Sequence, residues 1–173
     1  MKKIKLSIIQ SKNINDYKPI LEGLVGDFGH IYYHAILTWC GIINADWYKD
    51  NKYWQVYLVK HDDNVVGICG LYSHYENSID ELWLGWFGTI PEFRNKKIGQ
   101  FALEWMIENS KSIGCSKIMS YVNTDGKPLS FYYRNGFKRI CSVSEYLEIH
   151  KDLNIDEFEG MDDHVIEFKM PSQ

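Results

Sequence analysis

The sequence predicts a single α/β domain whose sheet combines an antiparallel hairpin with one pair of parallel strands. Two β-rich runs, 53–60 and 65–72, are joined by a short polar turn, which is typical of a hairpin. A later run, 82–90, is followed by a segment of helical periodicity and then by a further run at 117–122. This order is typical of a βαβ unit, whose two strands run parallel.

The N-terminal part predicts one strand and two helices. Residues 4–10 read as a strand, and 15–24 read as a helix that opens at a polar cluster, Asn13 to Asp16. The aromatic-rich stretch from 28 to 47 predicts a second helix, because its apolar residues recur at helical spacing: Phe28, Ile31, Tyr32, Ala35, Ile36 and Trp39.

The central part carries the hairpin and the βαβ unit. The polar residues 61–64 form the hairpin turn, and 76–80 form a second turn into the run 82–90, which is nearly continuously apolar and therefore indicates a strand buried on both faces. The next helix is expected to end near Ser112, with Gly114 as its stop. Its apolar face comprises Ile98, Phe101, Ala102, Trp105, Met106 and Ile107.

The C-terminal part predicts a short helix between two strands. Pro128 is well placed in the first turn of a helix over 128–135, and Gly136 stops it. Strand structure resumes over 137–143, and 164–169 is expected to be a last strand at the edge of the sheet.

The composition argues against nucleic-acid and membrane proteins. The net charge is −4 and the pI is about 5.8, whereas phosphate backbones are held mainly by surplus Lys and Arg. No stretch approaches the roughly 20 apolar residues of a membrane span. Ser7, Gln10 and Ser11 interrupt the N-terminal segment before an apolar core of signal-peptide length. We therefore expect a cytoplasmic protein with a cationic or neutral substrate.

The cysteines and histidines predict no metal site and no redox motif. His30 and His34, four residues apart on a predicted helix, could bind a metal or act as a base, but no third ligand accompanies them, and a partly buried aromatic helix face accounts for them. The four cysteines are far apart and form no C-x-x-C pair: Cys40, Cys69, Cys115 and Cys141.

A basic loop connects the buried strand 82–90 to the following helix. The strand breaks at Pro91, and the loop carries Arg94, Lys96 and Lys97. The N-terminus of a helix offers unpaired N–H groups and a partial positive charge, so this junction is a candidate anion site. A solvated basic turn before an ordinary amphipathic helix is the alternative.

Two segments resemble the GCN5-related N-acetyltransferase (GNAT) family. Residues 91–99 (PEFRNKKIG) are similar to its acyl-CoA pyrophosphate loop, whose pattern is Arg or Gln, two residues, Gly, one residue, then Gly or Ala. Arg94 and Gly99 match the outer positions, and Lys97 stands where the family usually has its first glycine. Residues 131–137 (FYYRNGF) are similar to the family's F-Y-x-x-x-G-F segment.

The resemblance is strongest over 53–143, and it implies a single GNAT domain over 1–173. The implied fold is a mixed, mostly antiparallel sheet of six to seven strands with a splayed parallel pair and flanking helices. The implied ligand is acetyl-CoA, the acetyl donor, with no metal. The residues that match its binding positions are Phe87, Gly88, Thr89, Arg94, Asn95, Lys97, Ile98, Gly99, Gln100 and Asp125.

The same resemblance implies an N-acetyltransferase in which the amine attacks the thioester directly. Tyr132 matches the family's acid, which protonates the departing thiolate. Backbone amides near Phe87, Gly88 and Thr89 would polarise the thioester carbonyl. For the general base we favour Glu81, at the entrance of the buried strand; the other candidates are Asp80, Glu76, His30, His34 and His74.

The amine acceptor is expected to be a small cationic molecule, such as a polyamine, an aminoglycoside-like compound or an amino sugar. The family's N-terminal helices form the acceptor wall, and here they supply an acidic and aromatic set. A peptide acceptor, a non-catalytic acyl-CoA-binding module, a nucleic-acid domain using Arg94 to Lys97 and a homodimer are left open. The expected wall comprises Asp27, Tyr32, Tyr33, Trp39, Asp46, Trp47 and Tyr48.

Overall fold

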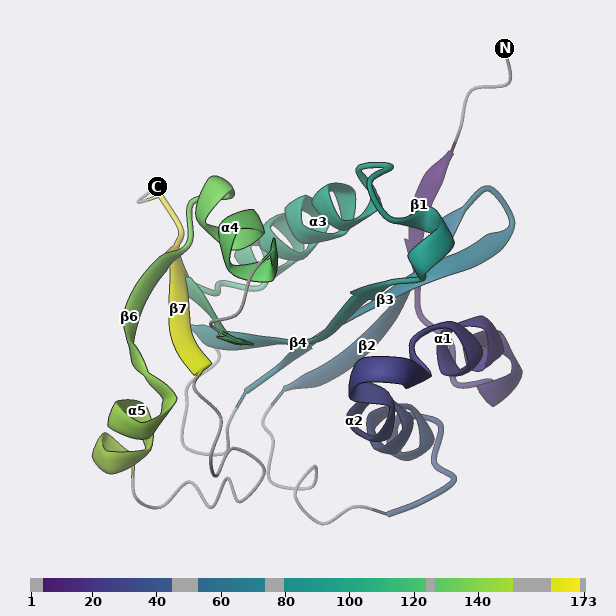
Figure 1. Ribbon diagram of the computed structural model, residues 1–173, viewed down its shortest axis with the longest axis horizontal. Coiled ribbons are helices and arrows are strands. Elements are labelled where there is room, and N and C mark those ends of the chain that lie inside the picture. Colours follow the sequence, from purple (N-terminus) through teal and green to yellow (C-terminus); the bar gives the residue numbers. More distant parts are fainter. Residues whose placement is uncertain (1–4, 45–52, 74–79, 124–126, 151–162, 172–173) are drawn as a thin grey trace.

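The computed structural model describes residues 5–44, 53–73, 80–123, 127–150 and 163–171. Within these residues one seven-stranded sheet has the order β1-β2-β3-β4-β5-β7-β6 (Figure 1). Every neighbouring pair is antiparallel except β4 and β5, which confirms the predicted mixed sheet with one parallel pair. The strands are β1 (Leu6–Ile9), β2 (Trp54–His61), β3 (Asn64–Tyr72), β4 (Glu81–Thr89), β5 (Lys117–Asn123), β6 (Lys138–Ser142) and β7 (Asp163–Lys169).

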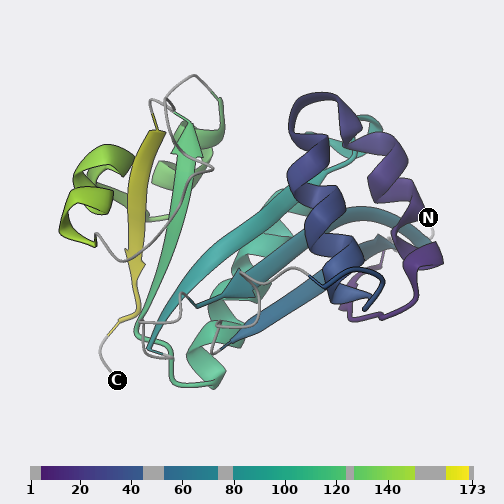
Figure 2. The same ribbon diagram turned by 90° about the horizontal axis from the view of Figure 1, so that it is seen from below.

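Helices cover both faces of the sheet, as Figures 1 and 2 show. Buried side chains of α3 and α4 pack on one face, and those of α1 and α2 pack on the other. The last helix, α5, packs on β5 and β7. The helical elements are η1 (Ile14–Tyr17), α1 (Lys18–Gly23), α2 (Val25–Trp39), η3 (Pro91–Phe93), α3 (Ile98–Ser112), α4 (Lys127–Arg134) and α5 (Val143–Ile149).

The parallel strands β4 and β5 pair over only three positions, from Glu81 opposite Lys117 to Trp83 opposite Met119. Beyond that point the two strands diverge, and Figure 2 shows them close at one end and apart at the other. The backbone edge of β4 after Trp83 therefore has no β5 partner. We call this opening between the diverging parts of β4 and β5 the splay. A ligand backbone can take the place of a strand there.

A β-bulge lies in the diverging part of β4. The register with β3 shifts between Ile68 and Gly70, so an extra residue is accommodated on β4. Trp86 adopts φ 48°, a left-handed conformation that is costly for a residue with a bulky side chain. Strained backbone of this kind is concentrated at functional sites.

Most predicted elements agree with the observed ones, but the predicted helix over 28–47 ends at Trp39, as α2, and three further differences occur. The strand at 164–169 was expected at the sheet edge, and this is wrong: β7 lies between β5 and β6, so β6 forms the edge. Val165 and Ile166 are completely buried, because the strand is paired on both sides. The N-terminal helix also begins one residue earlier than predicted, as the 3₁₀ turn η1.

Helix α5 was not predicted at all. It begins with a capping box, in which Ser142 Oγ accepts from the backbone N–H of Glu145 at 3.2 Å. The Glu145 carboxylate in turn accepts from the backbone N–H of Ser142 at 2.7 Å. The S-x-x-E pattern was present in the sequence and is a known signal for a helix start. These hydrogen bonds lower the pKa of the Glu145 carboxyl.

Candidate active site

The basic loop folds so that the start of α3 is left without a side-chain cap. Lys97 is the residue before the helix, with φ 60° and ψ 12°, and its side chain makes no capping hydrogen bond. Asn95 also has a positive φ, 62°. The first N–H groups of α3, at Ile98, Gly99 and Gln100, therefore remain available to an anion, as the resemblance implied.

Lys97 adopts the left-handed conformation that the family's glycine would adopt with less strain. Lys97→Gly is expected to raise the free energy of unfolding by about 1 kcal/mol, because a side chain in this region costs roughly 1–2 kcal/mol and glycine gains some unfolded-state entropy. Urea denaturation measures the change. Lys96→Gly is the control, since Lys96 lacks a positive φ, and should destabilise slightly. Loss of stability in Lys97→Gly would contradict the strain argument.

Gly99 lies at the start of α3, beside side chains of α4 and of the end of β4. A Cβ added there would lie 3.9 Å from the rings of Phe131 and Phe87 and 4.0 Å from Thr89 Oγ1. These distances are ordinary contacts, so the position has room. Phosphate binding at Gly99 stays a prediction.

Side-chain hydrogen bonds link α3 to the end of α4, and link the basic loop to β4. Gln100 Nε2 donates to Asn135 Oδ1 at 2.6 Å, and Asn135 Nδ2 donates to the Phe131 carbonyl at 2.8 Å. Arg94 Nε donates to the Thr89 carbonyl at 3.1 Å, while its side chain stays exposed. The predicted cofactor residues of the loop and of α3 thus lie together at the mouth of the splay.

Along β4, the backbone N–H and C=O groups of successive residues point alternately toward β3 and toward the splay. The Ile90 N–H donates to the Val66 carbonyl at 2.9 Å, which marks a hydrogen-bonded position with β3. Two residues earlier, Gly88 is in the same phase and therefore faces β3. An added Cβ on Gly67 would lie 2.8 Å from the Gly88 oxygen, as expected for a carbonyl directed at β3. The N–H of Gly88 therefore points toward β3 and is not directed at the splay.

Phe87 and Thr89, in the opposite phase, face away from β3. Their carbonyls accept hydrogen bonds from side chains on the open side, from Tyr32 Oη at 3.1 Å and from Arg94 Nε at 3.1 Å. In extended backbone the N–H of a residue points to the same side as its carbonyl. Of the three residues that we predicted as thioester donors, Phe87 and Thr89 have the required orientation.

Tyr132 is buried beside the bulge, with a side chain that is 7% exposed. Its ring centroid lies 6.2 Å from that of Phe87 and 5.2 Å from that of Phe137. Burial raises the pKa of the phenol, and nearby Tyr32 adds to this effect, while a hydrogen bond with Ser120 opposes it. Tyr132 therefore keeps its proton at neutral pH, as a proton donor must.

Ser120 was not predicted, because a single serine in a strand carries no sequence signal. It is 3% exposed and sits on β5 at the first position beyond the paired part of the sheet. Its Oγ lies 3.4 Å from the Leu84 carbonyl of β4, so it bridges the two strands where they separate. Ser120 also opposes the rise in the pKa of the Tyr132 phenol.

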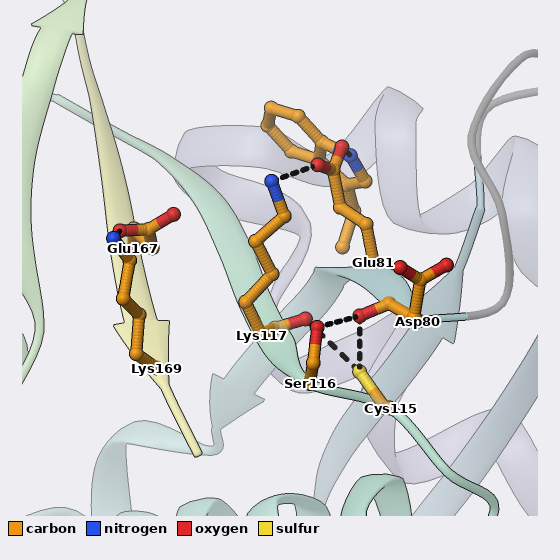
Figure 3. Close-up of polar contacts among 8 residues, drawn as sticks. Asp80, Glu81, Cys115, Ser116, Lys117, Glu167 and Lys169 are labelled. Carbon is orange, nitrogen blue, oxygen red and sulfur yellow. Dashed lines mark hydrogen bonds and ion pairs between the residues drawn. The ribbon is translucent and has the colours of Figure 1, made fainter. Parts of the chain in front are cut away.

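Glu81 lies at the closed end of the strand pair, away from the bulge. Its Oε2 is 2.5 Å from Lys117 Nζ, and its Oε1 accepts from Trp83 Nε1 at 3.3 Å (Figure 3). Six residue steps of strand separate it from Phe87, roughly 20 Å in an extended chain. A base at Glu81 would act through water. The neighbouring Asp80 is exposed, and its backbone carbonyl accepts from Ser116 Oγ at 3.0 Å.

The acceptor wall is only partly described. Tyr33 is 48% exposed, whereas Trp39 is buried and donates from Nε1 to the Ser11 carbonyl at 2.7 Å, so Trp39 is a core residue. His34 is exposed. Outside the described residues or side chains lie Asp27, His30, Asp46, Trp47, Tyr48, His74, Glu76 and Asp125.

Neither a metal cluster nor a membrane-spanning helix is found in the described part of the chain. No group of three or more His, Cys, Asp or Glu side chains there could hold a metal ion. No described helix is both long and apolar enough to cross a membrane. All four cysteines are free thiols.

Residues 21–137 match the model of the acetyltransferase (GNAT) family. The chain belongs to the GNAT family. The chain is therefore by family an acyltransferase. No significant match was found among curated protein sequences.

Solved structures with the same GNAT fold cover nearly the whole chain. One is the PaiA N-acetyltransferase of Thermoplasma acidophilum in complex with coenzyme A, with 19% identity, coverage of 96% of this chain and 99% of the other, and a TM-score of 0.66. An aminoglycoside 6′-N-acetyltransferase complexed with coenzyme A has 14% identity, coverage of 98% and 99%, and a TM-score of 0.67. The Escherichia coli ribosomal-protein-S18-alanine N-acetyltransferase has 10% identity, coverage of 99% and 96%, and a TM-score of 0.63.

Proposed function

We propose that this GNAT protein transfers the acetyl group of acetyl-CoA to the primary amine of a small cationic molecule. The observation that carries the proposal is the splay of β4 and β5, which has outward donors on β4 and an uncapped helix start at its mouth. Arg94, Lys96 and Lys97 are exposed beside that helix start and complement the phosphates. Coenzyme A complexes of two GNAT neighbours support the choice of donor.

In the proposed reaction the amine nitrogen attacks the thioester carbonyl carbon and the carbon–sulfur bond breaks. The outward N–H groups of Phe87 and Thr89 stabilise the negative charge that develops on the carbonyl oxygen. Tyr132 donates its proton to the departing thiolate. The proton lost by the amine passes to water, and Glu81, which is ion-paired with Lys117, can receive it only along a chain of several waters. The products are the N-acetylated amine and coenzyme A.

The α2 side of the sheet supports a cationic acceptor. Tyr33 of α2 offers a ring that is 48% exposed, whereas Trp83 and Trp86 are buried core residues. Glu81 adds a carboxylate on the same face as Trp83. Aromatic faces and carboxylates both attract cations. The solved neighbours include acetyltransferases for an aminoglycoside and for spermidine, which are amines of this class.

Acetyl-CoA should stabilise the protein by mass action. At 100 times its Kd, a ligand that binds only the native state adds about 2.7 kcal/mol. For a domain of this size that corresponds to a rise in Tm of roughly 5–10 °C. Thermal unfolding with and without acetyl-CoA measures the shift. Desulfo-CoA that lacks the 3′-phosphate is the comparison ligand, and a smaller shift with it would measure what the missing groups contribute to binding. An unchanged Tm together with no heat of binding would exclude the proposed donor.

Acetyl-CoA consumption against a panel of amines tests the acceptor class. We expect turnover with polyamines, aminoglycosides or amino sugars that exceeds turnover with peptides. Faster turnover with peptides would assign a peptide N-acetyltransferase, the first alternative. Acetyl-CoA binding without turnover on any amine would assign a non-catalytic acyl-CoA-binding module. Salt-sensitive binding of oligonucleotides would be required for a nucleic-acid function.

A further inference from the structure

Two side chains occupy the outward carbonyls of β4 at the bulge. Tyr32 Oη donates to the Phe87 carbonyl and Arg94 Nε donates to the Thr89 carbonyl, both at 3.1 Å. A strand edge normally presents donors and acceptors in alternation. Because the Phe87 and Thr89 carbonyls already accept these hydrogen bonds, this edge of β4 presents mainly N–H donors to the splay. That is the arrangement a thioester oxygen needs as it becomes negative.

Tyr32 reaches this edge from α2, on the opposite side of the sheet from α3 and α4. Its ring fits against Gly88, where an added Cβ would lie only 3.1 Å from the hydroxyl oxygen. Burial raises the pKa of Tyr32 to about 12, and nearby Arg94 acts in the opposite direction. The phenol is therefore protonated at neutral pH and remains a hydrogen-bond donor.

The hydroxyl of Tyr32 fixes a part of the backbone that is strained. Trp86, the residue before Phe87, is held at φ 48°. A left-handed residue of this kind costs roughly 1–2 kcal/mol and persists only where neighbouring contacts determine it. The hydrogen bond to the Phe87 carbonyl is one such contact. It turns Phe87 outward, and the N–H of Phe87 with it.

We propose that Tyr32 is a positioning residue for acetyl transfer: by bonding the Phe87 carbonyl, its hydroxyl holds the Phe87 N–H toward the thioester oxygen. The inference rests on the proposed use of acetyl-CoA. It adds a role for α2, which otherwise supplies only the acceptor wall. The role is distinct from that of Tyr132, which donates a proton, because Tyr32 acts through the backbone of β4.

Tyr32→Phe tests the proposal, because it removes the hydroxyl and keeps the ring. We expect kcat to fall roughly tenfold or more, by analogy with the loss of an oxyanion donor, with the Kd of acetyl-CoA changed by less than threefold. Tyr17→Phe is the matched control, since it removes a phenol that donates to another backbone carbonyl, that of Ser11 at 2.9 Å, and its kcat should equal that of the wild type.

The carbonyl stretch of bound acetyl-CoA gives a second readout that a purely structural role would not change. With ¹³C-labelled acetyl-CoA, infrared difference spectra should show the band shifted to lower wavenumber in the wild type and less shifted in Tyr32→Phe. An unchanged band and unchanged kcat in a folded Tyr32→Phe variant would overturn the inference. So would loss of acetyl-CoA binding in that variant, which would assign Tyr32 to binding. A wild type that does not bind acetyl-CoA would instead overturn the proposed function itself.

Discussion

Tyr132→Phe should lower kcat by about 10²- to 10⁴-fold, the usual contribution of a general acid, while the Kd of acetyl-CoA stays nearly constant. The hydroxyl acts on the leaving thiolate, whose charge exists only in the transition state. The ring that packs against Phe87 and Phe137 is kept in the variant, so the fold should be kept as well. Steady-state kinetics at saturating acetyl-CoA, together with calorimetric binding, separates the two quantities.

Tyr133→Phe is the matched control for Tyr132→Phe. Tyr133 is the next residue of α4, but its side chain is 42% exposed, and its hydroxyl should contribute little to kcat. Equal loss in both variants would indicate a general effect on α4. A wild-type rate for Tyr132→Phe, with chemistry rate-limiting, would transfer the proton-donating role to Tyr133 or to water.

Gly99→Val should weaken acetyl-CoA binding by at least tenfold, which corresponds to about 1.4 kcal/mol. The first side-chain carbon fits, because its neighbours would be 3.9–4.0 Å away, so the protein should fold. The rest of the side chain would fill the space between Phe87, Phe131 and Thr89 where the phosphates are expected to approach α3. Isothermal titration with acetyl-CoA measures the loss.

Glu108→Val places the same β-branched residue on an exposed part of α3 that is distant from its N-terminus. It should leave the affinity for acetyl-CoA unchanged, since it touches neither the loop nor the splay. If Glu108→Val weakened binding as much as Gly99→Val, the effect would come from α3 stability. Unchanged affinity in Gly99→Val would mean that the phosphates bind elsewhere.

Most of the fold could be predicted from periodicity and from glycine and proline positions. Gly114 and Gly136 have φ 88° and 87° and follow the ends of α3 and α4, where the sequence placed helix stops. The position of β7 could not be predicted in this way. Its apolar pattern indicates a strand, but local pattern does not say which strands become its neighbours, because strand order is set by packing over the whole chain.

Sequence motifs predicted some candidate site residues, but residues whose role depends on the three-dimensional contacts between strands and helices were missed. Arg94, Gly99 and Tyr132 were predicted from the family resemblance, and in the structure Arg94 bonds to the Thr89 carbonyl while the Phe87 ring lies near both Gly99 and Tyr132. Ser120 and the bonding role of Tyr32 depend on which strands and helices meet, which no short pattern encodes. The bulge at Trp86 did have a signal, since glycines at 85 and 88 interrupt an apolar strand, as is typical of bulges.

The interior place of β7 has a consequence for how the chain folds. Strands β1 to β4 pair with close neighbours in sequence, apart from the longer connection between β1 and β2, and can assemble early through the local hairpin. Strand β5 ends at residue 123, yet its antiparallel partner begins only at residue 163. Contacts of such separation form late, because loop closure must precede them. During synthesis, β5 can therefore pair with β7 only after residues 163–169 have been made. Until then the edge of β5 is unpaired and prone to aggregation.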